Sequence, residues 1–268
     1  MITKQTPPEP DALDRQRRTT RNRRLGASMR FLVAAIIMVV ASGCSASTGS
    51  TASPAAPSET AAAEPVSEDL TGGRYLFGPF GDEPAVELVA TGPDGWFGYP
   101  DWAMDGPLPV RADAPTGIGI SFFTANGLYS DPCHWDVQGT GGADVGDVEV
   151  GPTVEDLVAG LRSNTFYTSS EPTPLTIDGY SGKQIELQLP DDPFTSCDKE
   201  PGDSGGHAFV FSGAGLYAQG PANIWDLHIL DVDDTRLIAV ILSYAKTPQA
   251  DLDLARDVIE TMDIVPST

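Results

Sequence analysis

The side chains of this chain that are candidates for reactive chemistry are three cysteines, three histidines and a serine in a glycine-rich string. A thiol can accept an acyl group, form a disulfide or bind a metal ion. A serine hydroxyl becomes a nucleophile when a histidine takes its proton. The surrounding sequence decides which reaction is open to each candidate, and the candidates are Cys44, Cys133, Cys197, His134, His207, His228 and Ser204.

Cys44 ends a short apolar segment near the N-terminus. Arg30 precedes the apolar residues 31–42, and small residues lead up to the cysteine. The segment is well short of the about 20 apolar residues that a membrane-spanning helix needs. Positive charge before an apolar run and small residues after it are typical of a signal peptide. The segment therefore predicts export of everything that follows it.

The string Ala41-Ser42-Gly43-Cys44 resembles the lipobox of bacterial lipoproteins. In that family the cysteine is acylated on its sulfur, and cleavage before it makes it the mature N-terminus. The resemblance implies lipidation of Cys44, a cell-membrane location and an extracytoplasmic domain. The alternative is an ordinary signal peptide that contains a cysteine.

The N-terminal residues 1–30 are basic, and the rest of the chain is acidic. Eight of the 16 Lys and Arg but only three of the 38 Asp and Glu lie in residues 1–30, which leaves a net charge of −27 after Cys44. A basic segment before an apolar run stays on the cytoplasmic side. An alternative start at Met29 would remove residues 1–28. The acidic part repels nucleic acid and anionic lipid, so neither is an expected partner.

The composition predicts four segments. These are a basic n-region (1–30), a signal-peptide core with the lipobox (31–43), the lipidated cysteine with a disordered tether (44–71), and one globular domain (72–268). The tether is rich in Ser, Thr, Ala and Pro and lacks the apolar residues needed to form a core.

If Cys44 carries lipid, Cys133 and Cys197 remain. In an exported protein such a pair is typical of a disulfide, which we expect to be structural. The alternative is a metal site that includes His134 beside Cys133. It lacks the Cys-x-x-Cys spacing of zinc sites, and no metal or cofactor is predicted.

The string around Ser204, Gly202 to Gly206, resembles the nucleophile segment of chymotrypsin-like serine proteases. There the serine is presented beside an oxyanion hole, and a histidine earlier in the chain takes its proton. Only His134 precedes Ser204, and it follows a cysteine where that family has Ala-His-Cys. Serine hydrolysis by Ser204 and His134 is therefore the alternative to a non-catalytic domain.

Short strands are predicted where β-branched and aromatic residues lie between Gly- and Pro-rich turns. Residues 237–242 are apolar on both faces and predict a central strand. The hairpin turn between two of the strands is expected over residues 178–182. The predicted strands are residues 74–77, 85–90, 118–124, 175–177, 183–189, 225–232 and 236–244.

Two helices are predicted. Thr153 suits an N-cap, with Asp156 three residues later completing a capping box. A second helix is expected to start at Thr247 as cap and Pro248 as first helical residue. Their apolar stripes are Val154, Leu157, Val158 and Leu161 in the first helix, and Leu254, Ala255, Val258, Ile259 and Met262 in the second.

These elements predict a single α+β domain, with two main helices packed on a mainly antiparallel sheet. The strings at 151–154, 178–183 and 225–232 are similar to uncharacterised actinobacterial lipoproteins over about residues 93–265. The order of strands and helices more distantly resembles the PsbP-like fold of LpqN-type lipoproteins. The resemblance implies a compartment and a fold, and it carries no catalytic motif.

Other polar and aromatic residues receive structural interpretations. Asp231, Asp233 and Asp234 are expected to form a turn rather than a calcium site. His228 alternates with apolar residues and is expected to be a buried structural residue. The Trp pair at 96 and 102 is expected to pack at the rim of the core, with a ligand platform as the alternative. The sequence thus favours a non-catalytic module that binds an unknown envelope ligand or protein.

Overall fold

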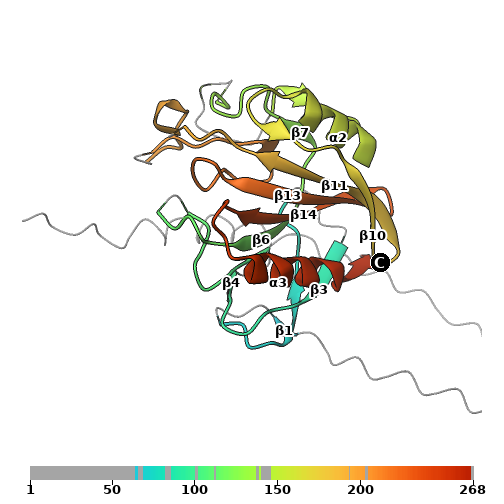
Figure 1. Cartoon of the computed structure of the whole chain (residues 1–268). Helices are drawn as coiled ribbons and strands as arrows, with labels where there is room; N and C mark the ends of the chain where they lie inside the picture. The colour runs from blue at the N-terminus through green and yellow to red at the C-terminus, as the bar shows by residue number, and fades with distance from the viewer. Residues whose placement is uncertain are drawn as a thin grey trace, which may run out of the picture. The chain divides into compact units, whose positions relative to one another are not determined.

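The computed structural model describes residues 64–65, 69–81, 86–99, 102–111, 113–136, 139, 146–192, 194–202 and 205–266. All belong to one unit, Ser58–Thr268. Its central feature is a large antiparallel sheet (Figure 1). In spatial order its strands are β10 (Thr173–Ile177), β11 (Tyr180–Gln188), β13 (Ile224–Val232), β14 (Thr235–Ser243), β6 (Gly119–Thr124), β5 (Ala103–Asp105) and β4 (Phe97–Tyr99), with β9 (Thr168–Ser169) also paired to β11.

The β13–β14 hairpin forms the middle of this sheet. Val232 pairs with Thr235 across a two-residue turn in which Asp233 and Asp234 have φ values of 50° and 68°. Positive φ at both turn residues matches the right-handed twist of the two strands. The side chains of β14 alternate between two apolar cores, so the prediction of a central strand is confirmed.

One face of the large sheet is covered by α2 (Val154–Ser163) and a small sheet of β12 (Phe211–Ser212), β7 (Gly127–Leu128) and β8 (Val148–Glu149). The predicted capping box at Thr153 and Asp156 is present. Such an N-cap contributes about 1 kcal/mol. The predicted apolar stripe of this helix is buried against the sheet, as expected: Val154, Leu157, Val158 and Leu161.

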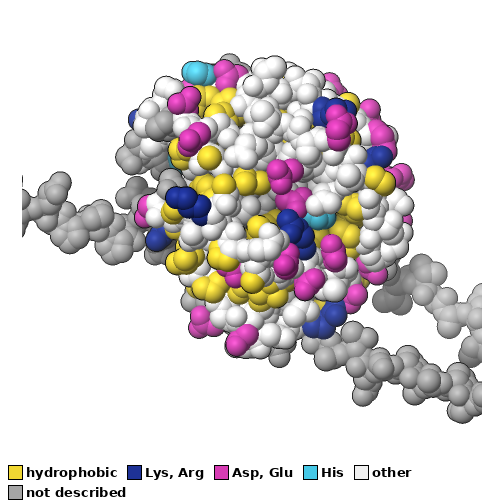
Figure 2. Space-filling model, viewed as in Figure 1, with side chains coloured by type: hydrophobic (Ala, Val, Ile, Leu, Met, Phe, Trp, Pro, Cys, Tyr) yellow, Lys and Arg dark blue, Asp and Glu magenta, His cyan; other side chains and the backbone are white. Residues whose placement is uncertain are grey.

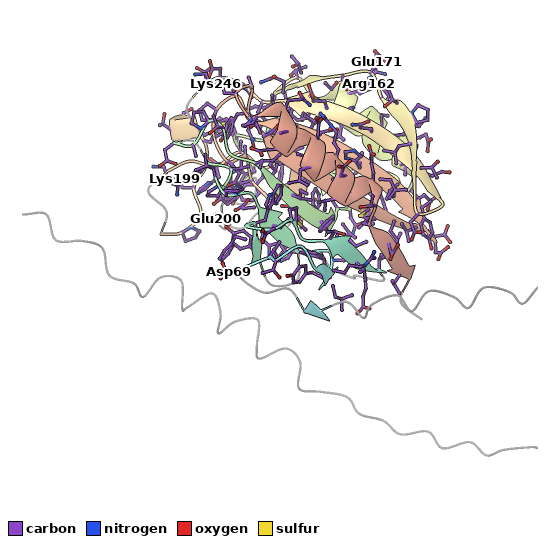
Figure 3. All side chains as sticks on the ribbon, turned by 60° about the horizontal axis from the view of Figure 1, so that its bottom comes forward. Asp69, Arg162, Glu171, Lys199, Glu200 and Lys246 are labelled. Carbon is purple, nitrogen blue, oxygen red and sulfur yellow. A yellow bond between two sulfur atoms is a disulfide. The ribbon has the colours of Figure 1, made fainter. Side chains whose placement is uncertain are left out.

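The other face is covered by α3 (Gln249–Glu260) and a second small sheet. The turned view in Figure 3 shows α3 lying across the large sheet. The second sheet consists of β1 (Glu64–Pro65), β2 (Arg74–Phe77), β3 (Val86–Thr91) and β15 (Asp263–Pro266), and only its β1–β2 pair is parallel.

A short 3₁₀ helix, η1 (Phe194–Ser196), interrupts the loop after β11. The α+β prediction with two main helices is confirmed.

Several predicted boundaries differ from the structure. Ordered structure begins before Gly72, because Glu64–Pro65 pairs with β2 and Leu70 is buried. The turn expected over residues 178–182 is only two residues long, because Asp178 and Gly179 both adopt positive φ and Tyr180 starts the next strand.

The last helix starts at Gln249 with Pro248 as its N-cap, one residue later than predicted. Thr247 does not cap the helix. Its hydroxyl donates to the Gly117 carbonyl at 2.9 Å and accepts from the Tyr244 N–H at 3.0 Å, so it ties the helix entrance to the sheet. Leu254 of the predicted stripe is 38% exposed, whereas Ala255, Val258 and Ile259 are buried.

Candidate functional site

The β4–β5 edge of the large sheet exposes aromatic rings. Phe97 and Tyr99 lie two residues apart on β4, so their side chains point to the same face. They are 39% and 37% exposed, and Phe80, from the loop after β2, is 44% exposed. Trp102 is half-buried. We refer to Phe80, Phe97, Tyr99 and Trp102 as the aromatic patch.

The four rings of the aromatic patch form a continuous row. Ring centroids are 5.2 Å apart for Phe97 and Tyr99, 6.3 Å for Tyr99 and Trp102, and 6.0 Å for Trp102 and Phe80. These separations fall in the range of favourable aromatic pairs. The rings therefore support one another while they remain open to solvent.

Two carboxylates flank Phe97. In the sheet register Phe97 is opposite Asp105 of β5 on one side and forms an isolated bridge with Asp69 on the other. Directly opposed residues of an antiparallel pair place their side chains on the same face. Asp69 is exposed, and Figure 3 shows it at the margin of the molecule. The aromatic patch thus has negative charge on both sides of its outermost ring.

Asp105 is held in a partly dehydrated position. The Tyr99 hydroxyl donates a hydrogen bond to Asp105 Oδ2 at 2.8 Å. Burial raises the pKa of Asp105 to about 6, and the hydrogen bond from Tyr99 opposes that rise. The pKa of Tyr99 is raised in turn, first by burial and then by its bond to Asp105. Within the described chain, Asp105 has no basic partner.

The backbone holds the aromatic patch in place. The Phe80 N–H donates to the Phe122 carbonyl at 2.9 Å, the Phe80 carbonyl accepts from the Thr124 N–H at 2.8 Å, and the Trp102 carbonyl accepts from the Phe122 N–H at 2.8 Å. A Cβ at position 119 would come too close to Asp105 Oδ1, so any larger residue there would require the carboxylate to shift. The rings and the carboxylate are therefore attached to the sheet rather than to a free loop.

This arrangement suits binding. Exposed ring faces carry negative potential and can hold an apolar surface or a cation. Figure 2 shows one face of the molecule, on which hydrophobic side chains reach the surface between scattered Asp and Glu side chains. An exposed aromatic group framed by polar residues is typical of an interaction site.

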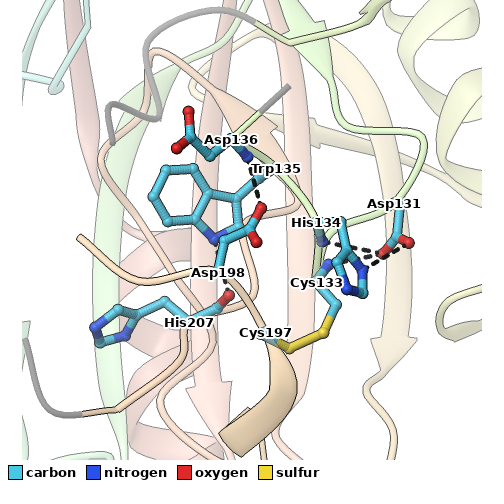
Figure 4. Close-up of a disulfide and its surroundings, with 8 residues drawn as sticks. All are labelled: Asp131, Cys133, His134, Trp135, Asp136, Cys197, Asp198 and His207. Atoms are coloured by element: carbon cyan, nitrogen blue, oxygen red, sulfur yellow. Dashed lines mark hydrogen bonds and ion pairs between the residues drawn. A yellow bond between two sulfur atoms is a disulfide. The ribbon is translucent and has the colours of Figure 1, made fainter. Parts of the chain in front are cut away.

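The predicted Cys133–Cys197 disulfide is present (Figure 4). Around it, the Asp198 N–H donates to the Cys133 carbonyl at 2.8 Å. The indole N–H of the fully buried Trp135 donates to the His207 carbonyl at 2.9 Å. The bridge therefore joins the loop after β11 to the segment after β7, and the contacts around it are those of a packed structural link.

The predicted pair of His134 and Ser204 is described only in part, because Ser204 lies outside the described residues. His134 Nδ1 is 3.0 Å from Asp131 Oδ2, and the imidazole is 61% exposed (Figure 4). Asp131 also accepts from the backbone N–H groups of Cys133 and His134. An aspartate at Nδ1 leaves Nε2 available as a base, which is the orientation that a serine nucleophile requires.

His228 is buried as expected, but its surroundings are more polar than predicted. It faces α3 together with Asp226, which accepts from Gln184 at 2.8 Å and lies 3.7 Å from Arg256. Burial lowers the pKa of His228, and the charges of Asp226 and Glu260 oppose this. Its Nδ1 has no hydrogen-bond partner within the described part of the chain. The predicted burial of His228 is thus confirmed, and Asp226 and Glu260 give it a polar environment that the apolar alternation did not indicate.

The acidic residues near 231–234 act as turn formers, since Asp233 and Asp234 are the two positive-φ residues of the β13–β14 turn. Across the described segments, no group of three or more His, Cys, Asp or Glu is placed to hold a metal ion. Trp96 is buried, and Trp102 packs against the core with one side while its other side contributes to the aromatic patch.

Cys44 and the apolar segment before it lie outside the described residues, so the lipid anchor stays a prediction. In the part of the chain that is described, neither helix combines the length and the apolar character needed to cross a membrane. No protein-family model matches the sequence, and no curated protein matches it significantly.

Sequence reasoning did not find the aromatic patch. The alternation of Phe97 and Tyr99 was a usable signal, because it places two rings on one face of a strand. Their proximity to Asp69, Phe80 and Asp105 depends on pairing between separate segments, which no local pattern encodes.

Proposed function

We propose that this protein is a membrane-anchored extracytoplasmic lipoprotein whose folded domain is a non-catalytic binding module, with its ligand site at the aromatic patch. The proposed binding role of the domain rests on one observation, the row of exposed rings beside a partly dehydrated carboxylate. Burying a Phe or Leu side chain contributes about 1.5–3 kcal/mol. Leaving several aromatic rings exposed gives up stability that an interaction with a ligand recovers.

The proposal of a lipid anchor rests on the N-terminal sequence. The apolar run of residues 31–42 is too short to span a membrane, and Cys44 follows it closely. Cys44→Ala removes the thiol that accepts the acyl group. We expect the variant to accumulate as an unprocessed precursor or to be released in soluble form, and to leave the detergent phase in a phase-partitioning assay. Equal partitioning of the variant and the wild type would rule out lipidation at Cys44.

The binding half is testable through the four tryptophans of the chain. Trp96, Trp135 and Trp225 are 3%, 0% and 0% exposed, so only Trp102 is positioned to sense a ligand on the surface. The protein is labelled with 5-fluorotryptophan and the Trp102 signal is assigned by its loss in Trp102→Phe. Soluble fractions of the cell envelope are expected to shift this fluorine resonance and leave the other three unchanged.

Substitutions at two side chains of similar exposure, one inside the aromatic patch and one outside it, show whether the response depends on the patch. Phe97→Ala removes a ring of the aromatic patch, whereas Leu254→Ala removes a 38% exposed side chain on α3. The envelope-induced shift should disappear in the first variant and persist in the second. A shift that survives Phe97→Ala, or one that moves all four signals, would place the binding site elsewhere.

The second candidate function is an envelope serine hydrolase using Ser204. The observation that favours it is the His134–Asp131 pair, together with the disulfide that holds the Cys197 loop beside His134. A fluorophosphonate probe tests it directly. Labelling of Ser204 that is lost in His134→Ala supports the hydrolase, and no labelling of the wild type supports the binding module.

A further inference from the structure

We propose that the aromatic patch binds an alkylammonium group, held over the rings of Phe97, Tyr99 and Trp102 and neutralised by Asp69 and Asp105. This inference rests on the proposed function and names the chemical class of its ligand. The other ligand class that aromatic surfaces accept, a sugar ring stacked on an aromatic face, is an outcome of the test.

The first argument is the chemistry of the rings. Cations are attracted to the faces of Trp, Tyr and Phe within about 6 Å of the ring centroid. Neighbouring centroids of the row lie 5.2 and 6.3 Å apart, so an ammonium group placed over the gap between two neighbouring rings lies within about 6 Å of both centroids. Alkyl substituents on the nitrogen would meet the same apolar surface, which a fully hydrated metal ion cannot use.

The second argument is the position of the carboxylates. Asp69 and Asp105 stand on opposite sides of Phe97 in the sheet register, with side chains on the face that carries the rings. Asp105 receives one hydrogen bond, from the neutral Tyr99 hydroxyl, and no cation of the described chain pairs with it. A ligand cation would supply the opposite charge that this partly buried carboxylate lacks.

The third argument is the charge of the whole extracytoplasmic part. Its net charge of −27 attracts cations and repels anionic ligands over a distance set by the ionic strength. A neutral sugar gains nothing from this field. Charge and ring chemistry therefore favour the same class of ligand.

The experiment uses the full-length protein in a nonionic detergent, labelled with 5-fluorotryptophan. The probes are choline, its uncharged isostere 3,3-dimethylbutan-1-ol, and cellobiose. Choline is expected to shift the Trp102 resonance in a saturable manner, with the isostere binding about tenfold more weakly. Equal binding of choline and the isostere, or a shift with cellobiose alone, would overturn the proposal.

Asp105→Asn tests the role of the carboxylate. The substitution keeps the shape and the oxygen that accepts from Tyr99, but it removes the negative charge. We expect choline binding to weaken about tenfold, whereas Leu254→Ala leaves it unchanged. Unchanged signals of Trp96, Trp135 and Trp225 show that each variant is folded. Undiminished choline binding by Asp105→Asn would remove the carboxylate from the site.

The failure of this inference is distinguishable from failure of the proposed function. If envelope fractions shift the Trp102 signal and choline does not, the patch is a binding site for another chemical class and the alkylammonium assignment is wrong. If neither shifts it, both the assignment and the binding role of the aromatic patch are wrong.

Discussion

The aromatic patch and the disulfide-bridged loop both gather aromatic rings, but only one of them buries its rings. Trp135 and Phe209, beside the disulfide, have centroids 4.8 Å apart at an interplanar angle of 67° and are at most 1% exposed. Phe97 and Tyr99 have nearly the same geometry, 5.2 Å and 71°, at 39% and 37% exposure. The two ring pairs therefore share their geometry and differ in how far they are buried.

Under the proposed function, this difference separates the residues that stabilise the fold from those that bind the ligand. At the disulfide, apolar area is removed from water and every ring contributes to holding two loops together. At the aromatic patch the same side chains contribute little to folding and stay available to a ligand. Substitutions that affect one region and spare the other test whether this division is real.

The largest expected effect is from truncating a buried ring. Phe209→Ala should lower the free energy of unfolding by about 3–5 kcal/mol, because it leaves a cavity beside Trp135 and Tyr217. Phe97→Ala should cost about 1 kcal/mol or less, since the ring is already partly hydrated. Urea unfolding of both variants measures the contrast. Similar losses would mean that the aromatic patch is part of the core.

Removal of the disulfide comes next. Cys133→Ala with Cys197→Ala opens a loop with a sequence separation of 64, and a loss of about 2–4 kcal/mol is expected. Ligand-induced change at Trp102 should persist in the folded variant, because the aromatic patch is held by β5 and β6. Thermal unfolding and the fluorine signal of Trp102 are the two readouts. Loss of the Trp102 response in a folded variant would show that the two regions are coupled.

The pH dependence of stability tests the charge of the aromatic patch. The folded-state pKa of Asp105 is about 6, above the ordinary aspartate value of 3.8, so folding favours the protonated acid. Ionisation of Asp105 therefore lowers the free energy of unfolding as the pH rises from about 4 to about 6, and this loss of stability persists at higher pH.

Asp105→Asn is neutral at every pH. It should exceed the wild type in stability by about 3 kcal/mol near pH 8, and the difference should nearly vanish near pH 4. Denaturant titrations at both pH values give the comparison. A difference between the two proteins that does not change with pH would mean that Asp105 is ionised equally well in the folded and unfolded states.

The smallest effect is expected at His134. The pair with Asp131 is exposed, and such pairs contribute about 0–1 kcal/mol. His134→Ala should therefore shift the free energy of unfolding by about 0.5 kcal/mol or less, although the disulfide is adjacent. A loss of several kcal/mol on urea unfolding would show that the pair supports the bridged loop.

Local patterns predicted much of the fold. The Thr153 capping box, the apolar stripe of α2 and the two-sided apolar character of β14 each depend on residues a few positions apart. Where prediction erred, a distant contact had changed the local choice. Thr247 bonds to Gly117 instead of capping α3, and Leu70 packs into a core that lies outside its own segment.

By itself, the sequence determined the Thr153 cap of α2, the strand periodicity and the presence of two cysteines suited to a disulfide, because these follow from residue types and short spacings. Only the tertiary structure decided that Phe97 would have Asp69 on one side and Asp105 on the other, with Phe80 completing the row of rings. Strand register joins these residues across separate segments, and register depends on how both faces of the sheet are covered. The burial that raises the pKa of Asp105 arises from the same packing.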